Sequence, residues 1–295
     1  MSTSPLAAVP DVHRSAPAFR GRIGRDARSG HYAVPHRYRL HLSTACPDGL
    51  RLAVGHSLLA LDGSCPVTPL PAVPDRPDGG HAALLPLYEA SAHHYTGPAL
   101  APVLSDDWSG RIVSTHARDI LRDLDRFAYD GGTCLYPCGT ESVIEAVERM
   151  CTEGIEGAAQ SAGRAGTDPA ERAAALEILL GALGRLERRL LDAEYLVGDR
   201  LTAADVELWV TLVQLDTVHR CHLDASAVHR ITGHHALWAY ARRLTARHAF
   251  GRHVDLDGIS RRHHGRCRGL ESAGAAVQIL DWAGHAADAP DASRR

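Results

Sequence analysis

The 295-residue sequence has no lysine, few aromatic side chains (5%) and no long apolar run. Its 32 arginines face 35 acidic residues, and the net charge of −3 gives no reason to expect a nucleic-acid or membrane-surface partner. No stretch approaches the roughly 18 apolar residues of a membrane span. Residues 1–18 lack the apolar core of a secretion signal. We therefore expect a cytoplasmic protein without nucleic-acid or membrane partners.

Paired cysteine and histidine motifs are also missing. The seven cysteines are an odd number without CxxC spacing, which is typical of a reducing compartment. No HExxH motif accompanies the histidines, and adjacent helical residues point about 100° apart, so they rarely share an ion. We expect no metal at the candidates His93–His94, His219–His222, His234–His235 and His263–His264. We also expect unpaired thiols at Cys134 and Cys138.

What the sequence does contain is a strand, a short loop and a helix around Cys46. Apolar and polar residues alternate over 38–43, the period of a half-buried strand. Pro47 suits the first position of a helix, where its missing N–H would have no partner. The helix N-terminus favours a thiolate, so we expect the pKa of Cys46 to be lowered. A buried structural cysteine is the alternative interpretation.

The remaining chain predicts two domains with flanking segments. Residues 1–30 form a flexible lead-in, with Phe19-Arg20 as the anchor point, and 31–130 form an α/β thioredoxin-like domain. A loop through Gly131-Gly132 and Pro137–Gly139 separates it from an all-helical domain over 140–270. Beyond residue 270 the sequence is rich in Ala, Asp and Arg, and we expect a tail over 271–295.

Local signals place several elements within these domains. A helix is expected over 81–93, with one short strand in the proline-rich stretch before it, and a hairpin over 95–113 is followed by a helix over 114–124. Pro102 inside the hairpin suits an edge strand or a cis peptide. Helices are predicted over 141–150, 168–193 and 237–247, and the Thr202/Asp205 pair predicts a capping box.

The pattern Arg37–Arg51 is similar to the opening motif of the glutathionyl-hydroquinone reductases, the Xi class of glutathione transferases (Arg-Tyr-His-Leu-Tyr-Val-Ser-x-Ala-Cys-Pro-Trp-Ala-x-Arg). Tyr95–Leu104 resembles the family's Tyr-x-Gly-Arg-x-x-Val-Pro-Val-Leu. Leu196–Thr202 with Asp205 resembles its helical-domain signature. The resemblance implies a thioredoxin-like domain followed by a helical glutathione-transferase C-terminal domain, and a homodimer is one assembly it suggests.

The resemblance also implies a reaction. In that family a cysteine thiolate attacks the sulfur of a glutathione-quinol thioether, the quinol leaves, and a second thiol resolves the mixed disulfide. Cys46 falls on the nucleophile. The co-substrate is then glutathione or another small thiol, the electrophile is of the quinone type, and no metal takes part. The residues carried over to the thiol side are Pro47, Asp48, Arg51, Ala101, Pro102, His116 and Ala117, and those on the electrophile side are Glu156, His263 and His264.

Several of these positions differ from the family pattern. Asp48 replaces a tryptophan, and His116-Ala117 replace a Glu-Ser pair that binds the γ-glutamyl end of glutathione. The negative charge of Asp48 opposes the helix-end effect on Cys46, and His116 could instead contact an anionic group of the bound thiol. Two interpretations follow: an enzyme adapted to another small thiol, or a non-catalytic binding or structural protein with a decayed site. Conjugation without redox chemistry is a third, less expected because a cysteine occupies the site.

Overall fold

A four-stranded sheet organises the first domain of the computed structural model, which describes residues 19–24, 26–127, 133–267, 273–275 and 277–287. The strand order is β2-β1-β3-β4. β1 (Tyr38–Leu42) runs parallel to β2 (Val67–Pro69) and antiparallel to β3 (Val103–Asp106), which pairs antiparallel with β4 (Arg111–Ser114). Side chains of β1 alternate between buried and half-buried, which confirms the period-2 prediction. This is a thioredoxin-like sheet.

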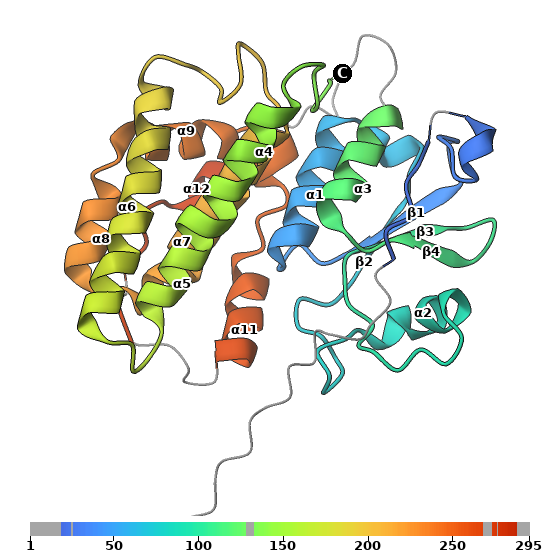
Figure 1. Ribbon diagram of the computed structural model, residues 1–295, viewed down its shortest axis with the longest axis horizontal. Helices are drawn as coiled ribbons and strands as arrows, with labels where there is room; N and C mark the ends of the chain where they lie inside the picture. Colours follow the sequence, from blue (N-terminus) through green and yellow to red (C-terminus); the bar gives the residue numbers. More distant parts are fainter. Residues whose placement is uncertain (1–18, 25, 128–132, 268–272, 276, 288–295) are drawn as a thin grey trace, which may run out of the picture.

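Helices cover both faces of this sheet. α1 (Pro47–Leu58) and α3 (Ala117–Leu124) lie on the face turned toward the second domain, and α2 (Leu85–Ser91) lies on the other side (Figure 1). The predicted hairpin is present as β3 and β4, although its first strand begins only at Val103, directly after the cis Ala101–Pro102 peptide. The cis interpretation of Pro102 is thereby confirmed.

The second domain is all helical (Figure 1). α4 (Glu141–Arg149) continues through a π-helical segment (Met150–Gly157) into α5 (Ala158–Gly163), so this helix is longer than the sequence predicted. The remaining helices are α6 (Pro169–Leu191), α7 (Ala203–Thr217), α8 (Ala225–Thr232), α9 (His235–Thr245), α10 (His248–Gly251), α11 (Leu256–Cys267) and α12 (Trp282–Ala287). Short 3-10 segments supplement them, among them His219–His222 after α7.

α7 is the central helix of the second domain because nearly all its side chains are buried. The predicted capping box begins this helix. The Asp205 carboxylate accepts from the Thr202 backbone N–H at 2.8 Å, and the Thr202 side chain accepts from the Asp205 backbone N–H. Asp205 also accepts from the hydroxyl of Tyr240 at 2.7 Å, which joins α7 to α9. A cap that is local in sequence therefore also fixes a long-range contact.

The expectations for the two ends need correction. Phe19 packs edge-on against Tyr88, and Ile23 is fully buried, so residues 19–24 are an ordered part of the first domain. Near the other end, Leu280 and Trp282 are buried, and the Trp282 indole donates to the Asp216 carboxylate at 2.9 Å. The tail prediction is wrong there because Asp216 provides buried acceptors for this segment. Residues 1–18 and the Gly131-Gly132 part of the predicted linker lie outside the described residues, and the exact domain boundaries stay predictions.

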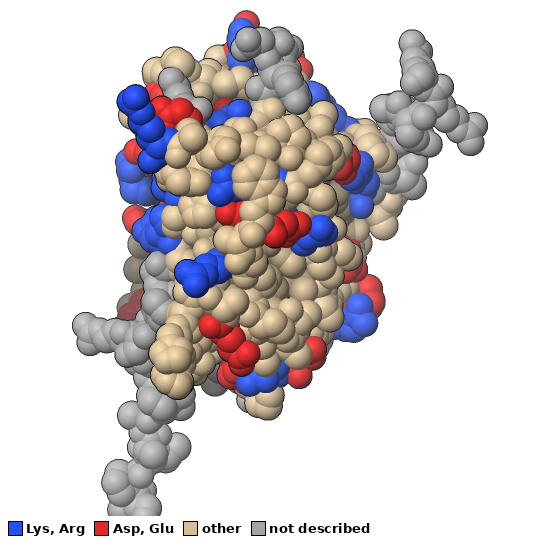
Figure 2. All heavy atoms as spheres, turned by 90° about the vertical axis from the view of Figure 1, so that its right-hand side faces the viewer, with Lys and Arg blue, Asp and Glu red and all other residues tan. Residues whose placement is uncertain are grey.

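Two further observations concern the chain as a whole. None of the helices described is long and apolar enough to cross a membrane. All seven cysteines are free, which confirms the unpaired thiols predicted at Cys134 and Cys138. On the face of the first domain shown in Figure 2, acidic and basic side chains are interspersed.

Candidate active site

Cys46 caps the N-terminus of α1. Its backbone is extended, and its Sγ accepts a hydrogen bond from the Gly49 N–H at 3.4 Å. Pro47 occupies the first helical turn as predicted. A Cβ added to Gly49 would lie 2.0 Å from the Ser43 carbonyl oxygen, so a glycine is needed for the helix to start this close to the loop. The local sequence therefore fixes the position of the thiol.

The pKa of Cys46 is raised, contrary to the expectation from the helix end. Burial is the largest cause, and the Asp48 carboxylate adds to it. The Arg262 guanidinium and the N–H groups of Gly49 and Asp48 lower the pKa, but by less. The side chain is only 6% exposed, so the desolvation cost of a thiolate exceeds the stabilisation by the helix N-terminus. In the free protein the thiol is protonated at neutral pH.

Strand register brings Cys46 and two predicted thiol-side residues, Pro102 and His116, to one edge of the sheet. β1 ends at Leu42, just before Cys46, and the register pairs His41 with Val103, so Pro102 lies beside the end of β1. β4 ends at Ser114, opposite Leu104, and leads directly to His116. We call Cys46, Pro102 and His116, together with their chain neighbours Ala101 and Ala117, the thiol edge.

His116 does not have the cationic character that was considered for it. Its ring Nδ1 accepts from the Asp119 backbone N–H at 3.3 Å and caps α3. Burial lowers the pKa of His116, with the Arg20 and Arg118 cations adding to this and the Asp119 and Asp48 carboxylates opposing it. Ala117 is buried in the main apolar cluster and offers no polar group. This part of the thiol edge therefore carries a neutral ring and a methyl group rather than charges.

Arg51 lies in an interdomain ion cluster that the sequence did not predict. This buried guanidinium pairs with Asp48 on its own helix and with Glu207 on α7. Glu207, itself buried, also accepts from Arg118 of α3 at 2.9 Å. Burial lowers the pKa of Arg51, but the surrounding carboxylates raise it by more, so the cation persists. We call Arg51, Arg118 and Glu207 the interdomain ion cluster.

A cavity of about 810 Å³ lies next to Cys46, between the start of α1 and the second domain. Its lining includes Ala45, Pro47, Glu156, Gln160, Arg164, Ala165, Gln214, Val218, His219, Ile259, Arg262, His263, Arg266 and Cys267. Two residues predicted for the electrophile side, Glu156 and His263, are among them. His264 is not: it is exposed, and its Nδ1 contacts the Ser260 carbonyl oxygen of its own helix at 2.7 Å.

The cavity wall carries more ionisable groups than the sequence suggested. Glu156 accepts from the Thr211 hydroxyl at 3.1 Å, and burial raises the pKa of Glu156 despite the opposing effect of Arg51. Arg262 donates to the Ala72 carbonyl at 3.1 Å and lowers the pKa of Cys46. Burial lowers the pKa of Arg262 itself. With His263 and Cys267, these residues form what we call the cavity wall.

Only one of the residues that were missed carries a signal in the sequence. Glu207 is a charged residue within the apolar run Val206–Val210, and such a residue needs a buried partner. Arg262 and Cys267 lie in a polar helix and look like surface residues until the tertiary structure places them at the cavity.

Comparison with known proteins agrees with this architecture. A family model described as glutathione S-transferase, C-terminal domain, matches residues 169–247. The chain is 28% identical over 294 residues to glutathionyl-hydroquinone reductase YqjG of Escherichia coli (91% of this chain, 88% of the relative). It is 30% identical over 227 residues to glutathionyl-hydroquinone reductase PcpF of Sphingobium chlorophenolicum (71% of each chain). The glutathione-bound structure of YqjG superposes with a TM-score of 0.74 at 25% identity, covering 89% of this chain and 94% of that one.

Proposed function

Because this chain belongs to the glutathionyl-hydroquinone reductase family, the Xi class of glutathione transferases, we propose that it is a thiol-dependent reductase of thioether conjugates with Cys46 as nucleophile. The observation that carries the proposal is the position of Cys46, which caps α1 at the sheet edge near a cis proline and lies between Ala45 and Pro47, two residues that line the cavity. Relatives named glutathionyl-hydroquinone reductases, one of them with a glutathione-bound structure, support glutathione as a co-substrate.

The proposed reaction has two steps. The Cys46 thiolate attacks the sulfur of the conjugate, forms a mixed disulfide with the small thiol and breaks the bond between that sulfur and the quinol carbon. This carbon leaves with the electron pair of the broken bond and takes up a proton, which gives the free quinol. A second thiol then attacks the mixed disulfide, releases a symmetric disulfide and restores Cys46. One free thiol is consumed for each conjugate reduced, and the other half of the disulfide is the small thiol that the conjugate carried.

Residues around Cys46 and in the cavity would assist these two steps. Arg262 and the N–H groups at the start of α1 favour the thiolate form of Cys46. Glu156 lines the cavity with a raised pKa, so its carboxyl group can hold the proton that the quinol carbon needs. Ala101 and Pro102 would present backbone groups to the thiol at the edge of the sheet. Because Asp48 and burial raise the pKa of Cys46, we expect turnover to rise with pH into the alkaline range.

The test is turnover of a glutathionyl-hydroquinone with glutathione as the second thiol. Chromatography should show free hydroquinone and glutathione disulfide forming in equal amounts. Cys46→Ser should slow the reaction by about 1000-fold or more, while Cys138→Ser, at an exposed cysteine, should leave the rate unchanged. A rate in Cys46→Ser equal to that of the wild type would contradict the proposal.

A second candidate function is a non-catalytic binding protein of the same fold. The raised pKa of Cys46 and the neutral His116 and apolar Ala117 at the thiol edge favour it. It predicts no turnover with any small thiol, together with saturable binding of an aromatic ligand in the cavity. The turnover assay, repeated with several thiols, separates the two candidates.

A further inference from the structure

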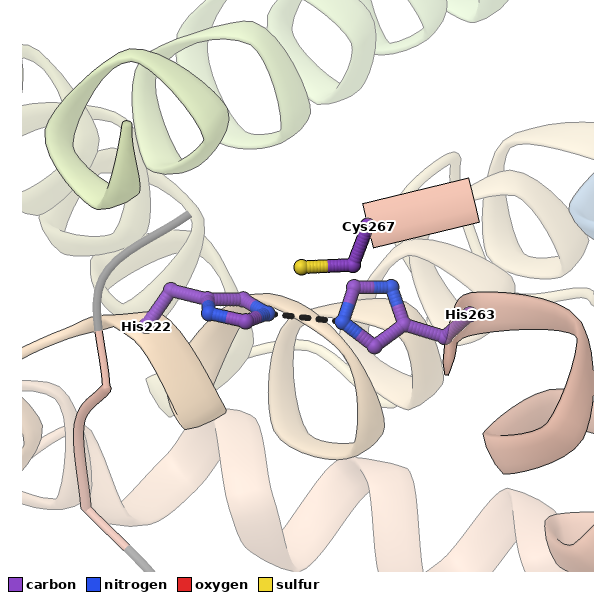
Figure 3. A group of neighbouring side chains, drawn as sticks. All are labelled: His222, His263 and Cys267. Carbon is purple, nitrogen blue, oxygen red and sulfur yellow. Dashed lines mark hydrogen bonds between the residues drawn. The ribbon is translucent and has the colours of Figure 1, made fainter. Parts of the chain in front are cut away.

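Three metal-ligating side chains meet beside the cavity. Figure 3 shows His222, from the 3-10 segment after α7, facing His263 and Cys267 of α11. One donor atom of each residue lies within 4.8 Å of the donors of the other two. The two imidazole Nε2 atoms are 2.7 Å apart. Two of the three residues, His263 and Cys267, line the cavity itself.

The backbone fixes this arrangement. His263 and Cys267 are four residues apart on α11, so both side chains project from the same face of the helix. Packing on α5 fixes the position of η7 (His219–His222), since a Cβ added to Gly163 would lie 2.8 Å from the Cβ of His222, and from there the His222 ring reaches His263. The donors therefore come from two elements that are distant in sequence and are held together by packing.

The geometry points to a Zn²⁺ site formed by His222, His263 and Cys267. Two imidazoles and a thiolate are the nitrogen and sulfur ligands that zinc prefers, at about 2.0–2.3 Å from the ion. A tetrahedral ion with these bond lengths places its ligand atoms about 3.3–3.6 Å apart. Starting from 2.7 Å between the nitrogens and at most 4.8 Å to the sulfur, small side-chain rotations reach these separations.

The site would present the ion to the cavity. Zinc takes four ligands, and a site with three protein ligands beside a cavity can accept water or an oxygen or sulfur atom of a bound molecule as the fourth. Cys267 loses its thiol proton when it binds the ion. The inference does not rest on thiol transfer at Cys46, because none of its ligands belongs to the thiol edge.

The test measures metal binding in the untagged, reduced, full-length protein carrying Cys46→Ala. Titration with Co²⁺ should give one equivalent of a species with a thiolate-to-cobalt charge-transfer band and tetrahedral d–d bands, and Zn²⁺ should displace it. Cys267→Ser should remove the charge-transfer band. His222→Ala and His263→Ala should each weaken Zn²⁺ binding by at least about 100-fold in competition with a chromophoric chelator.

Two controls separate this site from others. His264→Ala changes the neighbouring exposed histidine and should leave the affinity unchanged. The double variant Cys134→Ser, Cys138→Ser removes the two exposed thiols that could bind metal on their own, and it should retain the cobalt spectrum. The absence of saturable binding in the Cys46→Ala protein, or a charge-transfer band that persists in Cys267→Ser, would overturn the inference whether or not the wild type shows turnover.

Discussion

The thiol edge and the cavity wall divide the site into two different halves. The thiol edge comes from the first domain and has an N-cap cysteine, a cis proline and a helix beginning at Ala117, yet it carries few charged groups. The cavity wall comes from the second domain and carries Glu156, Arg262, His263 and Cys267. The first domain thus fixes the position of the Cys46 thiol, and the second supplies the ionisable side chains that line the cavity.

The interdomain ion cluster links α1 and α3 of the first domain to α7 of the second, so we expect it to contribute to the stability of the whole protein. Glu207→Gln removes the carboxylate shared by Arg51 and Arg118 and leaves buried positive charge without its partner. We expect it to lower the free energy of unfolding by about 3–5 kcal/mol, measured by denaturant titration. Glu177→Gln, which removes an exposed partner of Arg230, should cost less than about 1 kcal/mol. Equal losses of unfolding free energy in the two variants would show that the buried cluster stabilises the protein no more than an exposed ion pair does.

A second contact between the domains, that of His253 with Ser57, should lose its stabilising effect at acidic pH. His253, after α10, lies 2.7 Å from the Ser57 hydroxyl of α1, and burial, with help from Arg252 and His56, lowers the pKa of His253 from 6.5 to about 4. The unfolded chain therefore binds this proton more readily than the folded protein. The contribution of His253 to the free energy of unfolding should be fully present above pH 6.5, and about 3 kcal/mol of it should be lost as the pH drops toward 4.

His253→Gln checks this contribution in thermal unfolding measured across that pH range. The variant should show a flatter dependence of stability on pH than the wild type, whereas His93→Gln, at an exposed histidine, should follow the wild type. If His253→Gln keeps the full slope, another group causes the acid sensitivity.

The smallest expected effects concern the charges around Cys46. Asp48→Asn removes a carboxylate that raises the pKa of Cys46, so it should speed alkylation of Cys46 at neutral pH by up to about tenfold. Arg262→Gln removes a cation that favours the thiolate and should slow alkylation. Peptide mass spectrometry after iodoacetamide treatment measures this at the single residue.

Arg261→Gln is the matched control because Arg261 is exposed and pairs with Asp257 of its own helix at 3.1 Å. It should leave the alkylation rate of Cys46 unchanged. Changes in the same direction for Asp48→Asn and Arg262→Gln would contradict the balance of charges described for the thiol.

The sequence predicts features that depend on neighbouring residues and fails where distant residues meet. The N-cap position of Cys46, the Thr202/Asp205 capping box and the cis Pro102 were predictable, because each depends on a short stretch of chain. The raised pKa of Cys46 was not, because it comes mainly from burial, which depends on the tertiary structure. Trp282 looked like part of a tail because its acceptor, Asp216, is distant in sequence.

Thiol exchange at Cys46 is best tested by intact-protein mass spectrometry after incubation with disulfides of several small thiols. The wild type should gain one equivalent of a preferred thiol rapidly and lose it when the free thiol is added, whereas Cys46→Ala should not react at that rate. The selective thiol would identify the co-substrate. If Cys46 reacts no faster than the other six cysteines with every thiol, the catalytic account is wrong and the fold serves a binding role.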